Sequence, residues 1–547
     1  MGHDQRNVPL IVRSVAGYIL LWLLCVGTNL AADAPRPTRC GFGQERNVQH
    51  AQLRHAGIAS TNPRPQLPFY VDSPTGSFRV HFARTGSDAV PQTDLDGSGL
   101  EDYVEETIRA LDSAFRVEVT TLGFAVPPSD LDSGGSAAVD IYLRNLSFER
   151  ETGVYGVTRL ETIMPDPNGW DRYTAFIEID NDFSAEDRNV YDSLVYTRTN
   201  GIEALRVTCA HELHHVIQVG TYGYTGVEFM IYELTSTWME QVVYPEIYDW
   251  HLHTSALLRQ PWLYEFSRDD AFAGYAWGWF GWPLRERSDT LLRHVWTRIS
   301  SGERPFTAMV AACRDVGTSL SEIFCGALPS LYATGSRGAQ NAYLAGADQL
   351  PEIRYSADEL ARPPSSSAGG TLAAFGVNAL RFMIPGVDGA PVSTSIMITA
   401  PDEVALTNRR GSSTQYNVLA TASPLATDQT VQGSTWGIRI DPADRTCAFV
   451  SGLRTVLAGG PYPQPYVASQ HDALRFPVIN ARPGDAAIVR VRSVSLGQPT
   501  SYEAVVELDD DRLVVAWHDA RSIGTGIYIV EIEHASQTST HKVVIRR

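Results

Sequence analysis

The stretch TCAHELHHVIQVG, Thr208–Gly220, carries three histidines and one glutamate in an otherwise apolar run. Gly201 can begin a helix and Gly220 can end it, so one helix is predicted over this segment. On that helix His211 and His215 lie on one face, one turn apart, and imidazoles with this spacing can bind one Zn²⁺. The alternative is a surface helix with histidines on its polar side. The apolar character of the segment disfavours it, because buried imidazoles need partners.

Glu212 lies about 100° around the helix from His211, so its carboxylate is expected beside the metal rather than bound to it. There it can accept a proton from zinc-bound water, whose pKa the metal lowers to roughly 7. The pattern His-Glu-x-x-His therefore supplies both two metal ligands and a base for the metal-bound water. We expect Glu212 to be the catalytic base. His214 points elsewhere on the helix and is not expected to be a ligand.

A catalytic zinc ion usually takes three protein ligands and leaves a fourth position for water. A third histidine in the pattern His-x-x-Gly-x-x-His is excluded here, because Gln218 stands where that glycine belongs. A second helix is predicted after Gly226, ending before Pro245. The candidates for the third ligand on this helix and just beyond it are Glu228, Glu233, Glu240, His251 and His253.

AHELHHVIQ, followed by YELTSTWMEQVVYPEIYDW, resembles secreted bacterial zinc metalloproteases of the thermolysin-like, glutamate-ligand type. In these, His-Glu-x-x-His is followed by Glu-x-x-x-x-Trp-Met-Glu. The resemblance includes DLDGSGLEDYVE and LGFAVPPSD upstream and covers roughly residues 77–300. It implies a zincin-like α+β catalytic domain, with Glu233 as the third ligand and Trp238-Met239-Glu240 as the companion signature. The family's usual glycine after the ligand glutamate is Leu234 here.

A second metal site is predicted in DLDGSGLEDYVE, Asp94–Glu105. With Asp94 as position one, the oxygen-bearing residues follow the EF-hand loop template, Gly99 falls at position six, and a helix follows. The alternative is an acidic, solvated turn before a helix. We expect a structural Ca²⁺ ion, bound by Asp94, Asp96, Ser98, the main-chain carbonyl of Leu100, Asp102 and Glu105.

The first residues read as a secretory signal peptide of the bacterial export type, in which Arg6 and Arg13 precede the apolar VAGYILLWLLCVG. An N-terminal membrane anchor is the alternative. The C-terminal part shows short strand patterns, and its last stretch resembles the immunoglobulin-like modules of exported bacterial enzymes. The predicted order is signal peptide 1–34, extended leader 35–75, metallopeptidase domain 76–360, β-rich domain 371–455 and immunoglobulin-like β-sandwich 460–547, with a linker in PPSSSAGG, Pro363–Gly370.

The formal net charge of −18 makes nucleic acid and anionic membranes poor partners, so a secreted protein that is soluble after signal removal is expected. The sequence gives no indication of oligomeric state. Five cysteines follow the signal peptide, and pairs Cys313–Cys325 and Cys40–Cys447 are predicted, with Cys209 buried on its helix. An alternative role for Cys40 is that of a prodomain cysteine that caps a zinc ion, which the surrounding PTRCGFG faintly resembles.

Three further segments carry expectations. Tyr222, Tyr224 and Tyr232 are candidates for polarising the scissile carbonyl. TAFIEIDNDF, residues 174–183, is a candidate for the sheet edge along which a peptide substrate lies. The aromatic run YAWGWFGWPL, Tyr275–Leu284, is expected to be core rather than a substrate subsite.

We therefore predict a secreted zinc endopeptidase acting on a protein or peptide substrate. His211, His215 and Glu233 are expected to hold Zn²⁺, while Glu212 passes the proton of the attacking water to the leaving amine. The competing class is a secreted binding or adhesive protein, whose zincin domain is inactive and whose β-sandwiches bind the partner. The intact Glu212 argues against that class, since an inactive site does not need its base.

Overall fold

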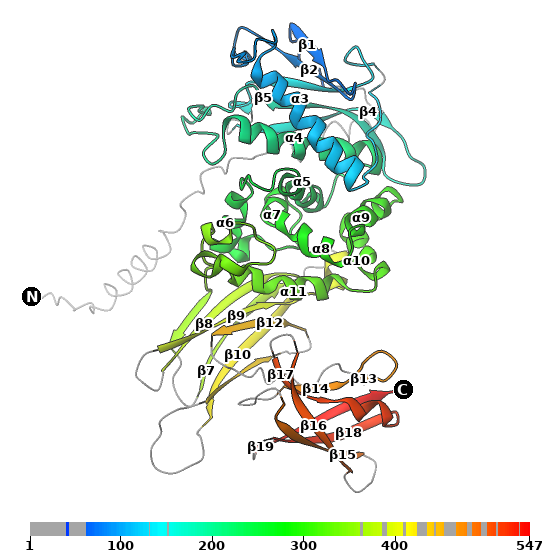
Figure 1. The fold of residues 1–547 in the computed structure, drawn as a ribbon, viewed down its shortest axis with the longest axis vertical. Coiled ribbons are helices and arrows are strands. Elements are labelled where there is room, and N and C mark those ends of the chain that lie inside the picture. Colours follow the sequence, from blue (N-terminus) through cyan, green and yellow to red (C-terminus); the bar gives the residue numbers. More distant parts are fainter. Residues whose placement is uncertain are drawn as a thin grey trace, which may run out of the picture. The chain divides into compact units, whose positions relative to one another are not determined.

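The computed structural model describes residues 40–42, 62–130, 132–149, 153–360, 365–385, 391–408, 412–423, 435–441, 445–452, 466–477, 484–493, 500–509, 512–534 and 537–547. The predicted signal peptide lies outside these residues. The described chain combines helices with several sheets, which is the mixed α+β class expected from the sequence (Figure 1). Within it, no helix is long and apolar enough to cross a membrane.

The chain divides into two compact units. The first takes the described residues within Met1–Ala114, Ser129–Thr162 and Thr174–Val216, and the second takes those within Phe115–Pro128, Ile163–Tyr173 and Ile217–Arg547. The boundary after Val216 falls inside one helix, α4, which runs over Gly201–Ile217.

The main sheet has five strands in the order β1-β2-β3-β5-β4. β1 and β2 are antiparallel, whereas β2, β3 and β5 run parallel to one another. The segment TAFIEIDNDF, singled out in the sequence, contributes most of strand β5. The bounds are Phe69–Asp72 for β1, Phe78–Phe82 for β2, Val139–Arg144 for β3, Gly156–Met164 for β4 and Arg172–Asp180 for β5.

The expectation that TAFIEIDNDF forms a sheet edge is wrong. β5 lies between β3 and β4, and the edge strand on this side of the sheet is β4, which the sequence patterns did not reveal. The physical reason is visible in the burial. β5 is buried at every position after Arg172, as an interior strand covered on both faces must be, while the last four residues of β4 are only half-buried.

The two helices predicted around the zinc motif are both present. α4 covers Gly201–Ile217 and continues into a π-helical turn, Gln218–Tyr222. α5 covers Phe229–Val243 and ends just before Pro245, which restricts the preceding residue to extended conformations. Every residue of α5 from Met230 to Gln241 is buried, so this helix lies in the core rather than on the surface.

The aromatic run Tyr275–Leu284 forms part of the core, as expected, with Trp277 and Trp279 at most 1% exposed. The other α-helices of the described chain up to Tyr332 are α3 and α6–α11. Their bounds are Asp102–Phe115 for α3, His251–Arg259 for α6, Ala271–Ala276 for α7, Gly281–Arg287 for α8, Leu291–Ser300 for α9, Pro305–Asp315 for α10 and Leu320–Tyr332 for α11.

The C-terminal third is built from strands, as the sequence predicts (Figure 1). A three-stranded sheet has the order β11-β10-β7, and a four-stranded sheet has the order β12-β9-β8-β6. Their strands are β6 Ala357–Leu360, β7 Ser365–Ala373, β8 Val377–Pro385, β9 Pro391–Thr399, β10 Ser413–Ser423, β11 Thr435–Asp441 and β12 Cys447–Gly452.

The last part forms a seven-stranded sheet, in the order β13-β19-β18-β15-β16-β17-β14. A cluster of buried side chains that includes Val489, Trp517 and Val530 forms its core. Its strands are β13 Tyr466–Val467, β14 Leu474–Pro477, β15 Ala486–Ser493, β16 Thr500–Asp509, β17 Arg512–Trp517, β18 Gly526–His534 and β19 Gln537–Arg546.

The linker predicted at Pro363–Gly370 is wrong for its described part, because Ser365–Ala373 is strand β7, paired antiparallel with β10. The small residues have a packing role there. A Cβ atom added to Gly369 would lie 2.7 Å from the main-chain oxygen of Tyr416, and one added to Gly370 would lie 3.0 Å from its hydroxyl. Composition alone could not distinguish this requirement from a flexible segment.

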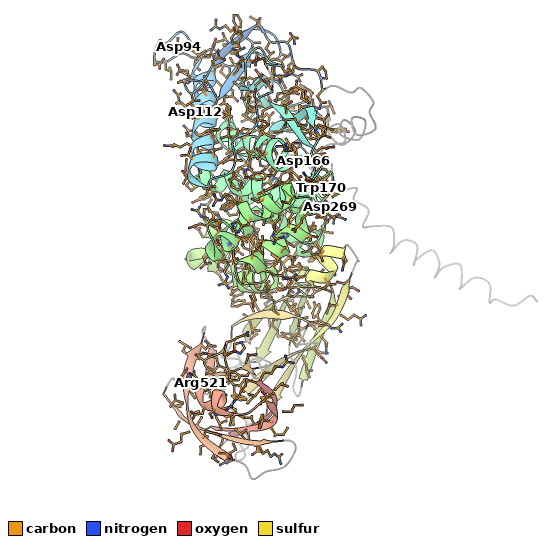
Figure 2. All side chains as sticks on the ribbon, turned by 90° about the vertical axis from the view of Figure 1, so that its right-hand side faces the viewer. Asp94, Asp112, Asp166, Trp170, Asp269 and Arg521 are labelled. Atoms are coloured by element: carbon orange, nitrogen blue, oxygen red, sulfur yellow. A yellow bond between two sulfur atoms is a disulfide. The ribbon has the colours of Figure 1, made fainter. Side chains whose placement is uncertain are left out.

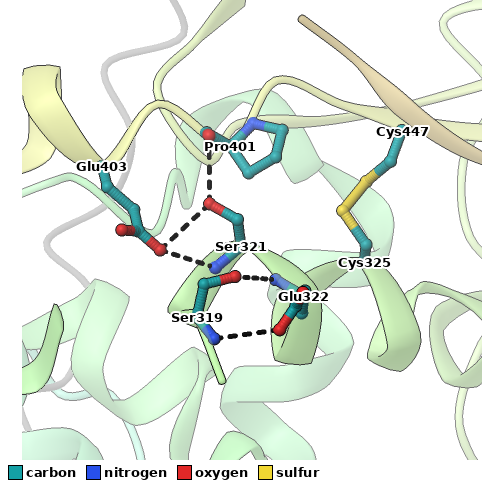
Figure 3. The surroundings of a disulfide bond; sticks show 7 residues. All are labelled: Ser319, Ser321, Glu322, Cys325, Pro401, Glu403 and Cys447. Carbon is teal, nitrogen blue, oxygen red and sulfur yellow. Dashed lines mark hydrogen bonds between the residues drawn. A yellow bond between two sulfur atoms is a disulfide. The ribbon is translucent and has the colours of Figure 1, made fainter. Parts of the chain in front are cut away.

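Both predicted disulfides are wrong. The structure pairs Cys325 of α11 with Cys447 of β12, with their Cα atoms 6.0 Å apart (Figure 3). Beside this bond, Ser321 donates hydrogen bonds to Pro401 and Glu403, so α11 is also tied to the chain after β9. Proximity in sequence was a poor guide, because the pairing depends on α11 packing against β9 and β12. Cys40, Cys209 and Cys313 are buried thiols.

Candidate metal centre

His211 and His215 project from the same face of α4, as their spacing requires. Both are almost completely buried, with exposed fractions of 2% and 0%. Their Nε2 atoms lie 3.1 Å apart. A hydrogen bond between two imidazoles has this length, and two nitrogens on one tetrahedral zinc ion are separated by a similar distance, about 3.4 Å from the usual Zn–N length.

The other donors around the two imidazoles favour a metal ion. Cys40, His211, His215 and Glu233 each offer one ligand atom, and these atoms all lie within 4.8 Å of one another. All four residues are buried. Two imidazoles, a carboxylate and a thiol are a donor set that suits Zn²⁺ and other borderline metals. The residues present therefore fit the metal that the sequence implies.

The remaining candidates for the third ligand do not belong to this group. Glu228 uses both carboxylate oxygens elsewhere, with Arg304 Nη2 at 2.6 Å and the amide of Phe306 at 2.8 Å. His251 Nε2 is 2.8 Å from the main-chain oxygen of Ala345. His253 packs against the ring of Tyr275, and Glu240 is buried further along α5.

Glu212 is buried, and only one of its two carboxylate oxygens accepts a hydrogen bond from a described residue. Its Oε2 accepts a hydrogen bond of 2.8 Å from the hydroxyl of Thr158, on strand β4. Its Oε1 is also buried and makes no hydrogen bond to any residue that the structure describes. The carboxylate is thus oriented by one oxygen while the other is left to accept a proton, which is the arrangement a general base needs.

Two residues of this site were missed by the sequence analysis, Gly156 and Thr158. Both lie on the edge strand β4. A Cβ atom at Gly156 would lie 2.6 Å from Thr208 Cγ2 and 2.9 Å from Glu212 Cγ, so only glycine lets β4 approach α4 this closely. The glycine and the threonine two residues apart in GVT, which fall on the same face of a strand, are a weak local signal for these two residues.

The absence of a glycine after Glu233 also has a structural explanation. Gly274 of α7 faces α5, and a Cβ atom there would lie 2.5 Å from Glu233 Cβ and 3.0 Å from the amide nitrogen of Leu234. Gly278 and Gly281 make equally close approaches to Thr237 and to Trp238, respectively. The close packing of α5 is therefore provided by glycines on the neighbouring segment, while Leu234 itself fills the core.

The predicted calcium loop brings together part of its expected ligands. Asp94, which is labelled in Figure 2, forms one group with Asp96 and Asp102. Gly99 has a positive φ of 84°, as the sharp turn of the template requires. Glu105 is outside the group, and its carboxylate lies 3.3 Å from Arg109 Nη1. The hydroxyl of Ser98 donates instead to the carbonyl of Leu100.

A third group of carboxylates was not predicted. Asp180, Asp182 and Asp187 follow the end of β5 and each offer an oxygen within 4.8 Å of the others. Burial, and secondly the neighbouring charge of Asp182, raise the pKa of Asp187 to about 6. Acidic clusters are common without an ion, so we assign this group no function.

Two of the three candidate tyrosines have hydroxyls engaged with the main chain. Tyr222 accepts a hydrogen bond from the amide of Ala125 at 3.1 Å. Tyr232 donates to the carbonyl of Gly223 at 2.7 Å and accepts from the amide of Thr225. Tyr224 is buried, and burial raises the pKa of its hydroxyl. Tyr222 and Tyr232 thus support the fold, and neither is a strong candidate for polarising a substrate.

Comparison with known proteins adds no assignment. No family model matches this sequence, and no curated protein or solved structure does either. The function is therefore argued from the site itself.

Proposed function

We propose that this protein is a secreted zinc-dependent endopeptidase. His211, His215 and Glu233 would hold the ion, in a zincin-like catalytic domain of the glutamate-ligand type. The observation that supports the proposal is that the donor atoms of these three residues lie within 4.8 Å of one another and that all three residues are buried. Three protein ligands of the type His₂Glu are a known catalytic zinc set.

The chemistry follows from the donors and from Glu212. A zinc ion supplies a Lewis acid that polarises a carbonyl and makes water a nucleophile near neutral pH. Glu212 Oε1 is available to take a proton, while Thr158 fixes the other oxygen and so the orientation of the carboxylate. The same carboxyl group can then give its proton to the leaving amine. These two transfers are what peptide hydrolysis requires of the protein.

Two further parts of the proposal lie outside the catalytic group. A structural Ca²⁺ ion would bind the loop that begins at Asp94, with Asp96 and Asp102 as its nearest partners. The C-terminal strands would form immunoglobulin-like modules that follow the catalytic domain in the sequence. Export through the N-terminal signal peptide would place the enzyme in an oxidising compartment, where the disulfide between Cys325 and Cys447 persists.

The test compares three variants of glutamates that are all fully buried. Glu233→Ala should lose zinc and activity together, because Glu233 is a ligand. Glu212→Gln should keep about one zinc per chain by elemental analysis, yet lose roughly 10²–10⁴-fold in hydrolysis of a casein-type substrate, because only proton transfer is removed. Glu240→Ala is the matched control on α5 and should retain zinc.

Three outcomes would contradict the proposal. If the purified protein, with His211 intact, contains no transition metal, it is not a zinc enzyme. Retention of near-full hydrolysis by Glu212→Gln would exclude the mechanism. A zinc-loaded wild type that cleaves nothing, even after any N-terminal processing, would favour a binding protein with an inactive catalytic domain.

A further inference from the structure

The segment Cys40–Phe42 lies against the edge strand of the main sheet. Cys40 forms a parallel β-bridge with Gly156, the first residue of β4, and the amide of Gly41 donates to the carbonyl of Gly156 at 2.9 Å. Peptides commonly bind to a protein by adding a strand to an exposed sheet edge. This part of the leader therefore occupies main-chain positions on β4 that a substrate peptide would otherwise use.

Two contacts direct the segment toward the metal ligands. The ring of Phe42 is stacked on the ring of His215, with centroids 4.0 Å apart and an angle of 12° between the planes. The amide of Phe42 points at Cys40 Sγ, at 3.2 Å, and an N–H group in this position favours a negative charge on the sulfur. Cys40 is only 4% exposed and Phe42 is completely buried.

The sulfur of Cys40 belongs to the same donor group as His211, His215 and Glu233. A catalytic zinc ion keeps its fourth position for water, whereas a structural site is closed by a fourth protein ligand. With Cys40 in place, the group has the four protein ligands of a closed site. Thiolate is also one of the strongest ligands that a protein offers to zinc.

We propose that Cys40 is a fourth, removable ligand that keeps the enzyme latent, and that the segment Cys40–Phe42 blocks the substrate edge at the same time. This inference rests on the proposed function. Activation then requires departure of the segment, by displacement or by cleavage of the leader. The Cys40 thiolate would then leave the metal and take up a proton from solvent, and the three remaining protein ligands would leave the fourth position to water. No oxidant or reductant is needed.

The leader has a second anchor downstream of Cys40. Asn62 donates to the carbonyl of Leu160 on β4 at 2.6 Å. Arg64 is held by Asp130, Asp140 and Glu161, with each N–O distance at most 2.6 Å. Because these contacts involve neither Cys40 nor the metal ligands, the sheet keeps its leader contacts when the short segment leaves. Release of Cys40 is thus separable from unfolding.

The first experiment measures the ligands directly, without relying on activity. Full-length protein carrying Glu212→Gln, which cannot process itself, is loaded with zinc and studied by X-ray absorption, after its intact mass shows that Cys40 is retained. We expect one sulfur at about 2.3 Å from the metal. Cys40→Ser in the same background should remove that sulfur, whereas Cys313→Ser, a change at another buried thiol, should leave it in place.

The second experiment measures latency. With the wild-type base restored, Cys40→Ser should hydrolyse casein from the first minute, while the wild type and Cys313→Ser should show a lag or a low initial rate. If the released state is a minor species, the difference should be roughly ten- to a thousandfold. If Cys40→Ser fails to fold, the rate at which iodoacetamide alkylates wild-type Cys40 is measured instead. Bound zinc should protect this thiol, and a chelator should expose it.

The outcomes separate this inference from the function on which it rests. Zinc bound through nitrogen and oxygen alone, with an immediately active wild type, would overturn the role of Cys40 and leave the peptidase intact. A sulfur ligand whose removal gives no activity would show a structural zinc site and overturn both. Protein without zinc in any variant would overturn the proposed function first.

Discussion

Gly274→Ala should weaken both zinc binding and stability, because Gly274 faces the residue proposed as third ligand. The new Cβ atom would lie 2.5 Å from Glu233 Cβ and 2.6 Å from the carbonyl oxygen of Met230. Ordinary contacts between such atoms are about 3.5–4.0 Å, so α5 and α7 must separate by roughly 1 Å. Both sides of the contact are backbone or Cβ atoms, which cannot rotate away.

The size of the effect follows from this displacement. Overpacking of a well-packed core costs about 1–3 kcal/mol, whereas replacing a helical glycine by alanine recovers about 0.5–1 kcal/mol. Protein metal sites tolerate ligand shifts of only about 0.2 Å. Disturbing the support of a ligand typically weakens metal affinity by about 10–100-fold, which is the loss we expect here.

The matched control is Gly326→Ala. Gly326 also lies inside a helix, α11, but an added Cβ atom meets nothing within 4 Å. It receives the same backbone benefit without the clash, so the difference between the two variants measures the packing cost alone. Zinc affinity would be measured by competition with a chelator, and unfolding by denaturant titration of the metal-free protein, followed through the fluorescence of the buried Trp277 and Trp279.

A clear result would refute this reasoning. If Gly274→Ala binds zinc as tightly as Gly326→Ala and unfolds at the same denaturant concentration, the close approach of α7 to Glu233 does not exist in solution. Loss of stability with unchanged zinc affinity would instead show that the packing is real but that Glu233 is not a ligand.

Three other predictions concern regions outside the catalytic group. Calcium added to stripped protein should raise the melting temperature, and Asp96→Asn should remove this response, because a ligand that binds only the folded state stabilises it; an unchanged melting curve would return the loop to a solvated turn. In the presence of a chelator, the folded protein favours the neutral carboxyl group of Asp187, whose pKa is raised from 3.8 to about 6. The resulting contribution to the free energy of unfolding is complete below pH 3.8 and is lost as the pH rises through about 6. Asp187→Asn should therefore flatten the dependence of denaturation midpoints on pH across this window, and a slope equal to that of the wild type would contradict the assignment. Replacing Cys325 and Cys447 by serine opens a loop with a sequence separation of 122 residues, and the chain-entropy model gives a loss of about 4–5 kcal/mol; equal unfolding curves before and after reduction of the wild type would show that the bond contributes nothing.

Some features of the candidate site could be read directly from the sequence. The spacing of His211 and His215 is a local property, because residues four apart in a helix share a face whatever surrounds them. The burial of α4 and α5 follows from their apolar composition, and the end of α5 before Pro245 follows from the chemistry of proline. The acidic loop at Asp94 is likewise a local pattern, and three of its carboxylates do come together.

Other features depended on contacts between distant parts of the chain. The sequence placed Glu233 and Glu240 on one helix but could not show which of them lies among the other donors. Thr158 reaches Glu212 across 54 residues, and Asn62 reaches Leu160 across 98. Contacts between distant residues also decide the position of Cys40 beside the histidines, the place of β4 at an edge of the sheet and the pairing of Cys325 with Cys447. Local propensity acts over a few residues and decides which elements form, whereas the meeting of distant side chains depends on how sheets and helices pack, and that is decided by the whole core at once.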